Sequence, residues 1–195
     1  MRNNRSMRIV VGISGASGII YGYRLLETLR ATGRAETHLV MTRSAERTAY
    51  LEMGKQIKEF KDLADYNYPV EDVGCRLASG SFQTNGMIIA PCSVHSMSAI
   101  ATGVSSNLLI RAADVILKER RKLILMVRET PFHLGHLRTM ASLTEMGAII
   151  APPIPGFYNN PETMMDLVDS SVERVMDLIG LPAESAKRWS GGKSE

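Results

Sequence analysis

Cysteine, tryptophan and long apolar runs are all scarce in this sequence, and each scarcity excludes a class of protein. The two cysteines, Cys75 and Cys92, are too few for the disulfide framework of a small secreted protein and suit a reducing compartment. No apolar run approaches the roughly 18 residues that a membrane-spanning helix needs. Glycine and serine interrupt the apolar stretch after the amino-terminal arginines, which argues against a signal peptide. We therefore expect a cytoplasmic protein that does not bind a membrane.

Charge of one sign is also scarce. The 23 Lys and Arg residues exceed the 20 Asp and Glu residues by only three, which argues against a nucleic-acid surface and is compatible with a pocket for small anions. The 45% hydrophobic and 22% charged content is ordinary for a globular protein. At 195 residues we expect a single domain over 1–195, with residues 1–6 and about 190–195 as loose tails.

Short apolar, β-branched runs alternate with longer amphipathic segments along the chain. The runs predict strands at 8–13, 37–42, 87–90, 122–127 and 148–151. The longer segments predict helices at 18–31, 43–53, 94–101, 107–120, 135–146 and 161–179, the last with Pro161 in its first turn and Gly180 at its end. Residues 54–80 break this rhythm and read as an irregular excursion with a short helix. The alternation predicts an α/β fold in three α/β/α layers around a doubly wound parallel sheet, whose ligands bind at the carboxyl ends of the strands.

The first strand-to-helix junction, 12–18, has the sequence GISGASG. Its glycines would let a bound anion approach the backbone, and its serines would add hydroxyl donors. It lacks the GxGxxG spacing of dinucleotide-binding proteins, and a tight turn with a serine cap is the alternative, but its position after the first strand favours anion binding.

The later junctions offer further polar groups. Thr42 ends the second predicted strand, and Glu52 lies ten residues beyond Thr42. The third junction, 91–96, has the sequence PCSVHS, where nothing completes a Cys–His–Asp pattern around Cys92. The four histidines show no zinc-ligand spacing, so we expect no metal.

Charged side chains gather on the helix predicted at 107–120 and after the strand at 122–127. Arg111, Asp114 and Lys118 share one helix face, either as a solvated ion-pair ladder or as the wall of a phosphate pocket. Arg128 and Glu129 follow the strand, where an arginine can clamp an anion and a glutamate can move a proton. Tyr158 and Arg174 lie further on, in a proline-rich loop and on the last helix.

In their order along the chain, these segments closely resemble the UbiX/Pad family of flavin prenyltransferases. The matching segments are GISGASG (12–18), ASGS (78–81), PCS (91–93), RAADVILKERR (111–121), RETP (128–131), PGFYNNP (155–161) and RW (188–189). The resemblance implies a flavodoxin-like, Rossmann-type fold that binds FMN, and a homo-oligomer, a dodecamer, with its sites between subunits. It also implies a metal-independent reaction in which dimethylallyl phosphate prenylates reduced FMN at N5 and C6. The product would serve a partner decarboxylase of the UbiD type.

The resemblance also assigns residues to roles. The implied flavin contacts are Gly15, Ala16, Ser17, Thr42, Ser93, Val94, His95, Ser96 and Arg128, and Arg111 completes the cationic pocket. The implied prenyl-phosphate contacts are Lys118, Tyr158 and Arg174. The implied catalytic residues are Ser17, Glu52, Lys118 and Glu129.

Some positions depart from the family pattern. Val127 stands where relatives often have proline, and Arg138 where they often have an acid. The tryptophan that some relatives place upstream of ASGS, to stabilise an allylic cation, is missing, so either Tyr66, Tyr68 or Phe82 replaces it or the role is absent. Two alternative functions remain open: an FMN-dependent cysteine-type decarboxylase of the same fold, and a non-catalytic flavin-binding subunit of a hydroxyarylic acid decarboxylase complex.

Overall fold

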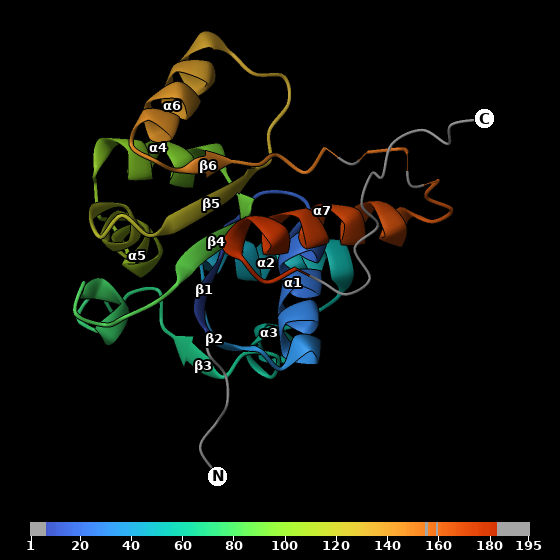
Figure 1. The fold of residues 1–195 in the computed structure, drawn as a ribbon, viewed down its shortest axis with the longest axis horizontal. Helices are drawn as coiled ribbons and strands as arrows, with labels where there is room; N and C mark the ends of the chain where they lie inside the picture. Colours follow the sequence, from blue (N-terminus) through green and yellow to red (C-terminus); the bar gives the residue numbers. More distant parts are fainter. Residues whose placement is uncertain (1–6, 155, 159, 183–195) are drawn as a thin grey trace.

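The computed structural model describes residues 7–154, 156–158 and 160–182. The expected tails at 1–6 and 190–195 lie outside these residues, as do Arg188 and Trp189. Within the described ranges a parallel sheet forms the centre of the molecule (Figure 1). Its strands are β1 (Met7–Ile13), β2 (Ala35–Met41), β3 (Tyr66–Tyr68), β4 (Gly86–Cys92), β5 (Lys122–Val127) and β6 (Ile149–Ile150), in the order β3-β2-β1-β4-β5-β6.

This order confirms the predicted doubly wound sheet. With the three-residue edge strand β3 set aside, it is the flavodoxin order, and with β3 included it is the Rossmann order. In both descriptions the chain reverses its direction of winding between β1 and β4, which is where such sheets bind ligands. The prediction for 54–80 was incomplete, since this segment holds β3 and a short 3₁₀ turn (Arg76–Ala78) besides the expected short helix α3 (Ile57–Lys61).

The remaining helices agree with the predicted ones to within a few residues. They are α1 (Ile19–Thr32), α2 (Arg43–Met53), α4 (Val94–Thr102), α5 (Leu108–Lys118), α6 (Leu134–Glu145) and α7 (Met164–Ile179). The placement of Pro161 in the first turn of the last helix was wrong. A capping box starts α7 instead, because Asp166 N donates to Thr163 Oγ1 and Thr163 N donates to Asp166 Oδ2. Gly180, in the left-handed conformation (φ 98°), ends it as predicted.

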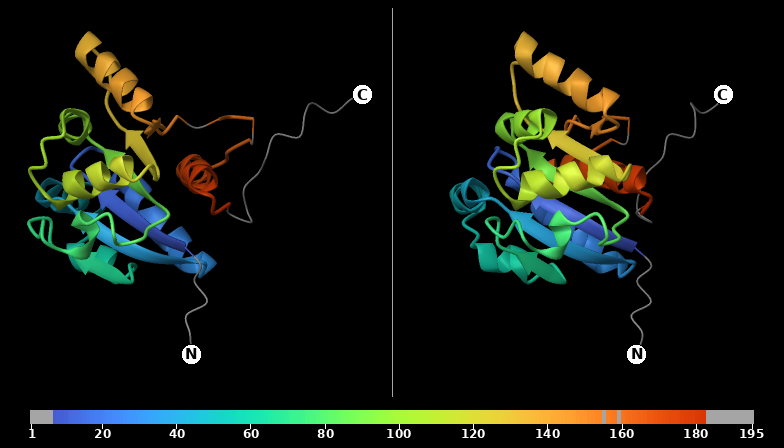
Figure 2. Two further views of the ribbon diagram at one scale, coloured as in Figure 1. Left: turned by 60° about the vertical axis from the view of Figure 1, so that its left-hand side comes forward. Right: turned by 90° about the vertical axis from the view of Figure 1, so that its left-hand side faces the viewer.

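Helices cover both faces of the sheet, and the two views in Figure 2 show the resulting layers. Alternate side chains of each strand enter different cores. In β1, Ile9 and Val11 join a core with α1 and α7, whereas Val10 joins a core with α4 and α5. Burial on both faces explains why the strands are continuous apolar runs without polar alternation.

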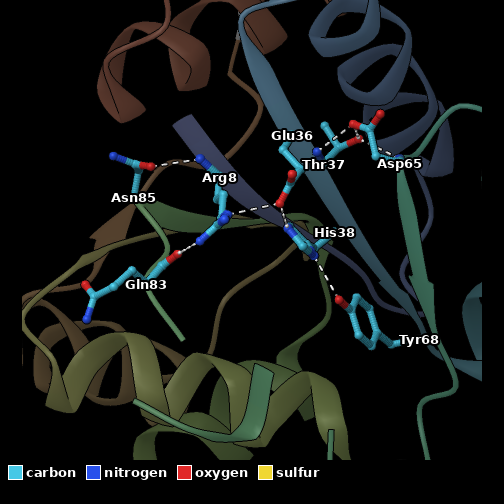
Figure 3. Close-up of polar contacts among 8 residues, drawn as sticks. All are labelled: Arg8, Glu36, Thr37, His38, Asp65, Tyr68, Gln83 and Asn85. Atoms are coloured by element: carbon cyan, nitrogen blue, oxygen red, sulfur yellow. Dashed lines mark hydrogen bonds and ion pairs between the residues drawn. The ribbon is translucent and has the colours of Figure 1, made fainter. Parts of the chain in front are cut away.

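A polar and aromatic cluster lies at the amino ends of β1 and β2 and extends to the edge strand β3 (Figure 3). The fully buried His38 of β2 makes hydrogen-bond contacts with Glu36 Oε1 (3.0 Å) and with the hydroxyl of Tyr68 (2.9 Å), and its ring stacks on Tyr66. Burial lowers the pKa of His38 against the opposing effect of the Glu36 carboxylate, and the positive charges of Arg76 and Arg8 lower it further.

His38 should therefore make the fold less stable in acid. Because its folded-state pKa is lowered, the unfolded chain binds the proton more readily once the pH falls below about 6.5, and the free energy of unfolding then decreases. We expect His38→Gln to flatten this decrease by at most about 1.4 kcal/mol per pH unit, the slope for one proton. Urea unfolding between neutral and mildly acidic pH measures the slope, with the exposed His95→Gln as control. Equal slopes in His38→Gln and the unmodified chain would contradict the expectation.

Candidate active site

A cavity of about 570 Å³ lies at the carboxyl ends of β1, β2, β4 and β5, at the reversal of the sheet. This volume falls within the usual range for cofactor and small-molecule sites. The residues that line it are Gly15, Ala16, Ser17, Thr42, Ser44, Ser93, Val94, His95, Ser96, Asn107, Arg128 and Glu129. Most of these contribute hydroxyl, amide or cationic groups, so the cavity is rich in donors for an anionic or carbonyl-bearing ligand.

Hydrogen bonds between the strand-end loops fix the floor of the cavity. Ser14, which is buried, donates from Oγ to Pro91 O (3.0 Å) and accepts from Ser93 N (2.8 Å), which joins the loop after β1 to the loop after β4. Gly15 packs so closely on Ser44 that a Cβ atom at Gly15 would lie 2.4 Å from Ser44 Oγ. A glycine is therefore required where these two loops meet.

Helices α2 and α4 begin at the cavity. Ala45 N donates to Thr42 Oγ1 at the start of α2, and Ser96 N donates to Ser93 Oγ at the start of α4, both at 3.2 Å. The amino ends of these helices carry partial positive charge and favour an anion. Together with the exposed guanidinium side chain of Arg128, they favour binding of a phosphate at the carboxyl ends of the strands.

Glu52 does not line the cavity but holds the start of α1. Its carboxylate accepts from Gly18 N (2.9 Å) and Ile19 N (3.1 Å). These N–H groups of α1 are therefore not available to a ligand, contrary to what the glycine-rich junction suggested. The anion-binding capacity of the first junction rests on residues 15–17.

Arg128 and Glu129 enter the cavity from the end of β5. Arg128 N donates to Cys92 O (3.0 Å), which anchors this loop to β4. Glu129 is half-buried, and its Oε1 accepts from Thr130 N (3.0 Å). The pair thus places a permanent cation and a carboxylate side by side at one wall.

Of the residues singled out from the sequence, ten are brought together in this cavity. They are Gly15, Ala16, Ser17, Thr42, Ser93, Val94, His95, Ser96, Arg128 and Glu129. Two further lining residues, Ser44 and Asn107, were given no role from the sequence. Asn107 precedes a helix as a typical N-cap residue, and Ser44 sits beside the predicted Thr42, but neither pattern by itself points to a ligand.

Within one chain, Lys118 lies near the amino ends of the strands, whereas the cavity lies at their carboxyl ends. It ends α5 four residues before β5 begins, whereas Arg128 follows the end of β5, and six residues of strand span about 20 Å. The ammonium group of Lys118 forms an ion pair with Glu119. A single chain therefore does not bring Lys118 into the cavity beside Arg128.

The other predicted phosphate contacts also lie outside the cavity of one chain. Arg111 forms an ion pair with Asp114 on α5 (2.6 Å), as expected if this helix face carries an ion-pair ladder and not a phosphate pocket. Arg174 is exposed on α7, which packs on α1 on the other side of the sheet from α5. Tyr158 is exposed in the segment before α7. None of these three residues lines the cavity of a single chain.

Two other interpretations of the sequence can be compared with the structure. Cys92 is completely buried, and burial raises the pKa of its thiol to about 12, so it stays protonated and is not a nucleophile. Tyr66, Tyr68 and Phe82 do not line the cavity, and their rings lie 5.0–6.0 Å from the guanidinium of Arg76. They therefore do not replace the missing tryptophan within one chain.

Two kinds of feature are not found in the described ranges. No group of three or more His, Cys, Asp or Glu residues there could hold a metal ion. No helix there is long and apolar enough to span a membrane.

The chain matches the protein-family model named Flavoprotein over residues 1–178. It is 54% identical over 187 residues to the flavin prenyltransferase UbiX of Thauera aromatica, with 96% of each chain covered. Among solved structures it is similar to AnUbiX (PadA1) in complex with FMN and dimethylallyl pyrophosphate, with a TM-score of 0.94 and 43% identity over 97% of this chain and all of that one. It is also similar to a dodecameric FMN-dependent UbiX-like decarboxylase from Escherichia coli O157:H7, with a TM-score of 0.92 and 44% identity over 95% of this chain and all of that one.

Proposed function

The chain belongs to the Flavoprotein family as a flavin prenyltransferase of the UbiX type, and from this we propose that it joins the dimethylallyl group of dimethylallyl phosphate to N5 and C6 of reduced FMN. The observation that carries the proposal is the cavity at the reversal of the sheet, which gathers ten of the predicted site residues. The product would be released in the cytoplasm to a UbiD-type decarboxylase.

The residues that line the cavity suit FMN. The N–H groups at the starts of α2 and α4 and the hydroxyls of Thr42, Ser93 and Ser96 suit the phosphate and ribityl oxygens, which need several donors. Arg128 adds a permanent cation. Bound reduced FMN would supply the nitrogen and carbon atoms that receive the prenyl group.

We propose that the prenyl-phosphate pocket is completed by another subunit. The structure of the E. coli O157:H7 relative is dodecameric, and we assign the same assembly to this chain. Large apolar side chains exposed on one chain support an assembly that covers them. They lie before and at the start of α7 and around the start of α6, namely Ile154, Phe157, Met164, Met165, Phe132, Leu134 and Leu137.

In this assembly the chain's own residues would divide the chemistry. The C1′–O bond of the donor breaks as its phosphate leaves, and Lys118, Arg111, Arg174 and the hydroxyl of Tyr158 would stabilise the developing negative charge. N5 and C6 each lose a proton as they bond to C1′ and C3′, one proton is added to C2′ of the dimethylallyl group as C6 bonds to C3′, and Glu129 and the released phosphate would carry these protons. Ser17 would keep a hydrogen bond near N5, and Glu52 would hold the start of α1 in place.

An anaerobic assay with reduced FMN tests this function. We expect dimethylallyl phosphate to give a flavin heavier by one C5H8 unit, with a new absorption spectrum and release of phosphate. Dimethylallyl pyrophosphate, tested in parallel, shows which donor the enzyme uses. FMN binding without any new flavin would favour a non-catalytic subunit, and decarboxylation of a peptidyl cysteine would favour the cysteine-type decarboxylase.

A further inference from the structure

Asn107 is an asparagine of the cavity wall that the sequence motifs did not single out. It lies in the connection between α4 and α5 and is the N-cap of α5, where its Oδ1 accepts a hydrogen bond from Ile110 N (3.1 Å). Its side chain is half-buried and lines the same cavity as Ser96 and Arg128.

The cap fixes which way the amide points. Only the oxygen of an asparagine amide can accept from a backbone N–H, so the contact with Ile110 N assigns Oδ1 to the helix and leaves the NH2 group on the other side. Among the described residues, Nδ2 of Asn107 donates to no protein acceptor, although the side chain lines the cavity. Two oriented donors are therefore available there.

The backbone N–H groups at the start of α5 are less available to a ligand than this side-chain amide. Leu108 N donates to Val70 O (2.8 Å), Ile110 N donates to the Asn107 side chain, and Leu109 is completely buried. What α5 presents to the cavity is consequently the side-chain amide of Asn107 and not the amino end of the helix.

We propose that Asn107 is a flavin-binding residue that donates from Nδ2 to an acceptor oxygen of FMN, while its Oδ1 caps α5. This inference rests on the proposed binding of FMN in the cavity. A flavin has carbonyl, ribityl and phosphate oxygens that accept such a bond. Because the amide is held by the helix cap, its donors are oriented before the ligand arrives, which limits the entropy lost on binding.

Three variants separate the donor from the cap. Aspartate and serine cap helices about as well as asparagine, but Asn107→Asp and Asn107→Ser lack the NH2 group. We expect both to keep the melting temperature of the flavin-free protein and to weaken FMN binding about tenfold, measured by quenching of flavin fluorescence. Asn107→Ala, which loses cap and donor together, should also lower the melting temperature. Asn85→Ser is the control, because Asn85 Oδ1 accepts from Arg8 N (2.8 Å) in the same way (Figure 3), and Asn85 precedes β4 at the end of the strand opposite to the cavity.

The outcomes of these experiments distinguish this inference from the proposed function on which it rests. Wild-type FMN affinity in Asn107→Ser would overturn the donor role, even if Asn107→Asp binds more weakly, since charge repulsion alone would then explain the aspartate variant. An unmodified chain that does not bind FMN at all would overturn the proposed function and this inference together. A change in the absorption spectrum of bound flavin in Asn107→Ser would support a direct contact, because a cap alone does not affect the flavin.

Discussion

Replacing Glu129 by glutamine should leave FMN bound and slow prenyl transfer by about 10²- to 10⁴-fold, the usual contribution of a general acid or base. Glu129 follows β5, lines the cavity and is half-buried beside Arg128. Glutamine keeps the size of the side chain and its ability to accept from Thr130 N, as Glu129 Oε1 does at 3.0 Å, but it cannot take up a proton. The expected loss is therefore in turnover and not in the fold or in flavin affinity.

Single-turnover kinetics under anaerobic conditions, with FMN affinity measured on the same sample, would separate the two effects. Glu145→Gln is a matched control, because Glu145 is an exposed glutamate at the end of α6, outside the cavity. The limb of the pH–rate profile that depends on the base should also disappear in Glu129→Gln. Turnover equal to that of the control would remove Glu129 from the mechanism.

The sheet was largely predictable because its strands are buried on both faces. The run at 122–127 gave β5 without error, and the other four predicted strands were found with shifted ends. β3 was missed because Tyr66, Asn67 and Tyr68 form a three-residue edge strand without an apolar run. The start of α7 was misplaced because proline is favoured in a first turn, whereas the capping box of Thr163 and Asp166 determined the true start.

The cavity was predictable to the extent that its residues follow strands in sequence. Four of these residues follow the end of a strand, and the parallel topology brings the carboxyl ends of the strands together. They are Ser17, Thr42, Ser93 and Arg128. The sequence did not show that Lys118 lies near the amino ends of the strands. Helix periodicity predicts which residues share a helix face, but not which end of the sheet they lie beside. Nor did it show that a cap residue such as Asn107 faces a ligand, which depends on how α5 packs.

The largest expected effect of assembly is recovery of activity when two inactive variants are mixed. Lys118→Ala should lose about 10²- to 10³-fold in turnover, as is usual when a group that stabilises developing negative charge is removed. Glu129→Gln should lose about 10²- to 10⁴-fold, because it lacks the base. If Glu129 of one copy and Lys118 of another form each site, oligomers assembled at random from equal amounts of both should have about one quarter of their sites intact.

Co-expression of the two variants with different affinity tags, followed by purification through both tags, provides mixed oligomers for the prenylation assay. Separately purified oligomers mixed without exchange of subunits are the control and should stay inactive. A site built within one chain would give no recovery, because every chain would carry one of the two defects. That outcome would require Lys118 to reach the cavity of its own chain, and the span of β5 and the ion pair with Glu119 both oppose such an arrangement. Recovery near one quarter would instead place the two residues in different subunits of one site, as the separation of about 20 Å along β5 requires.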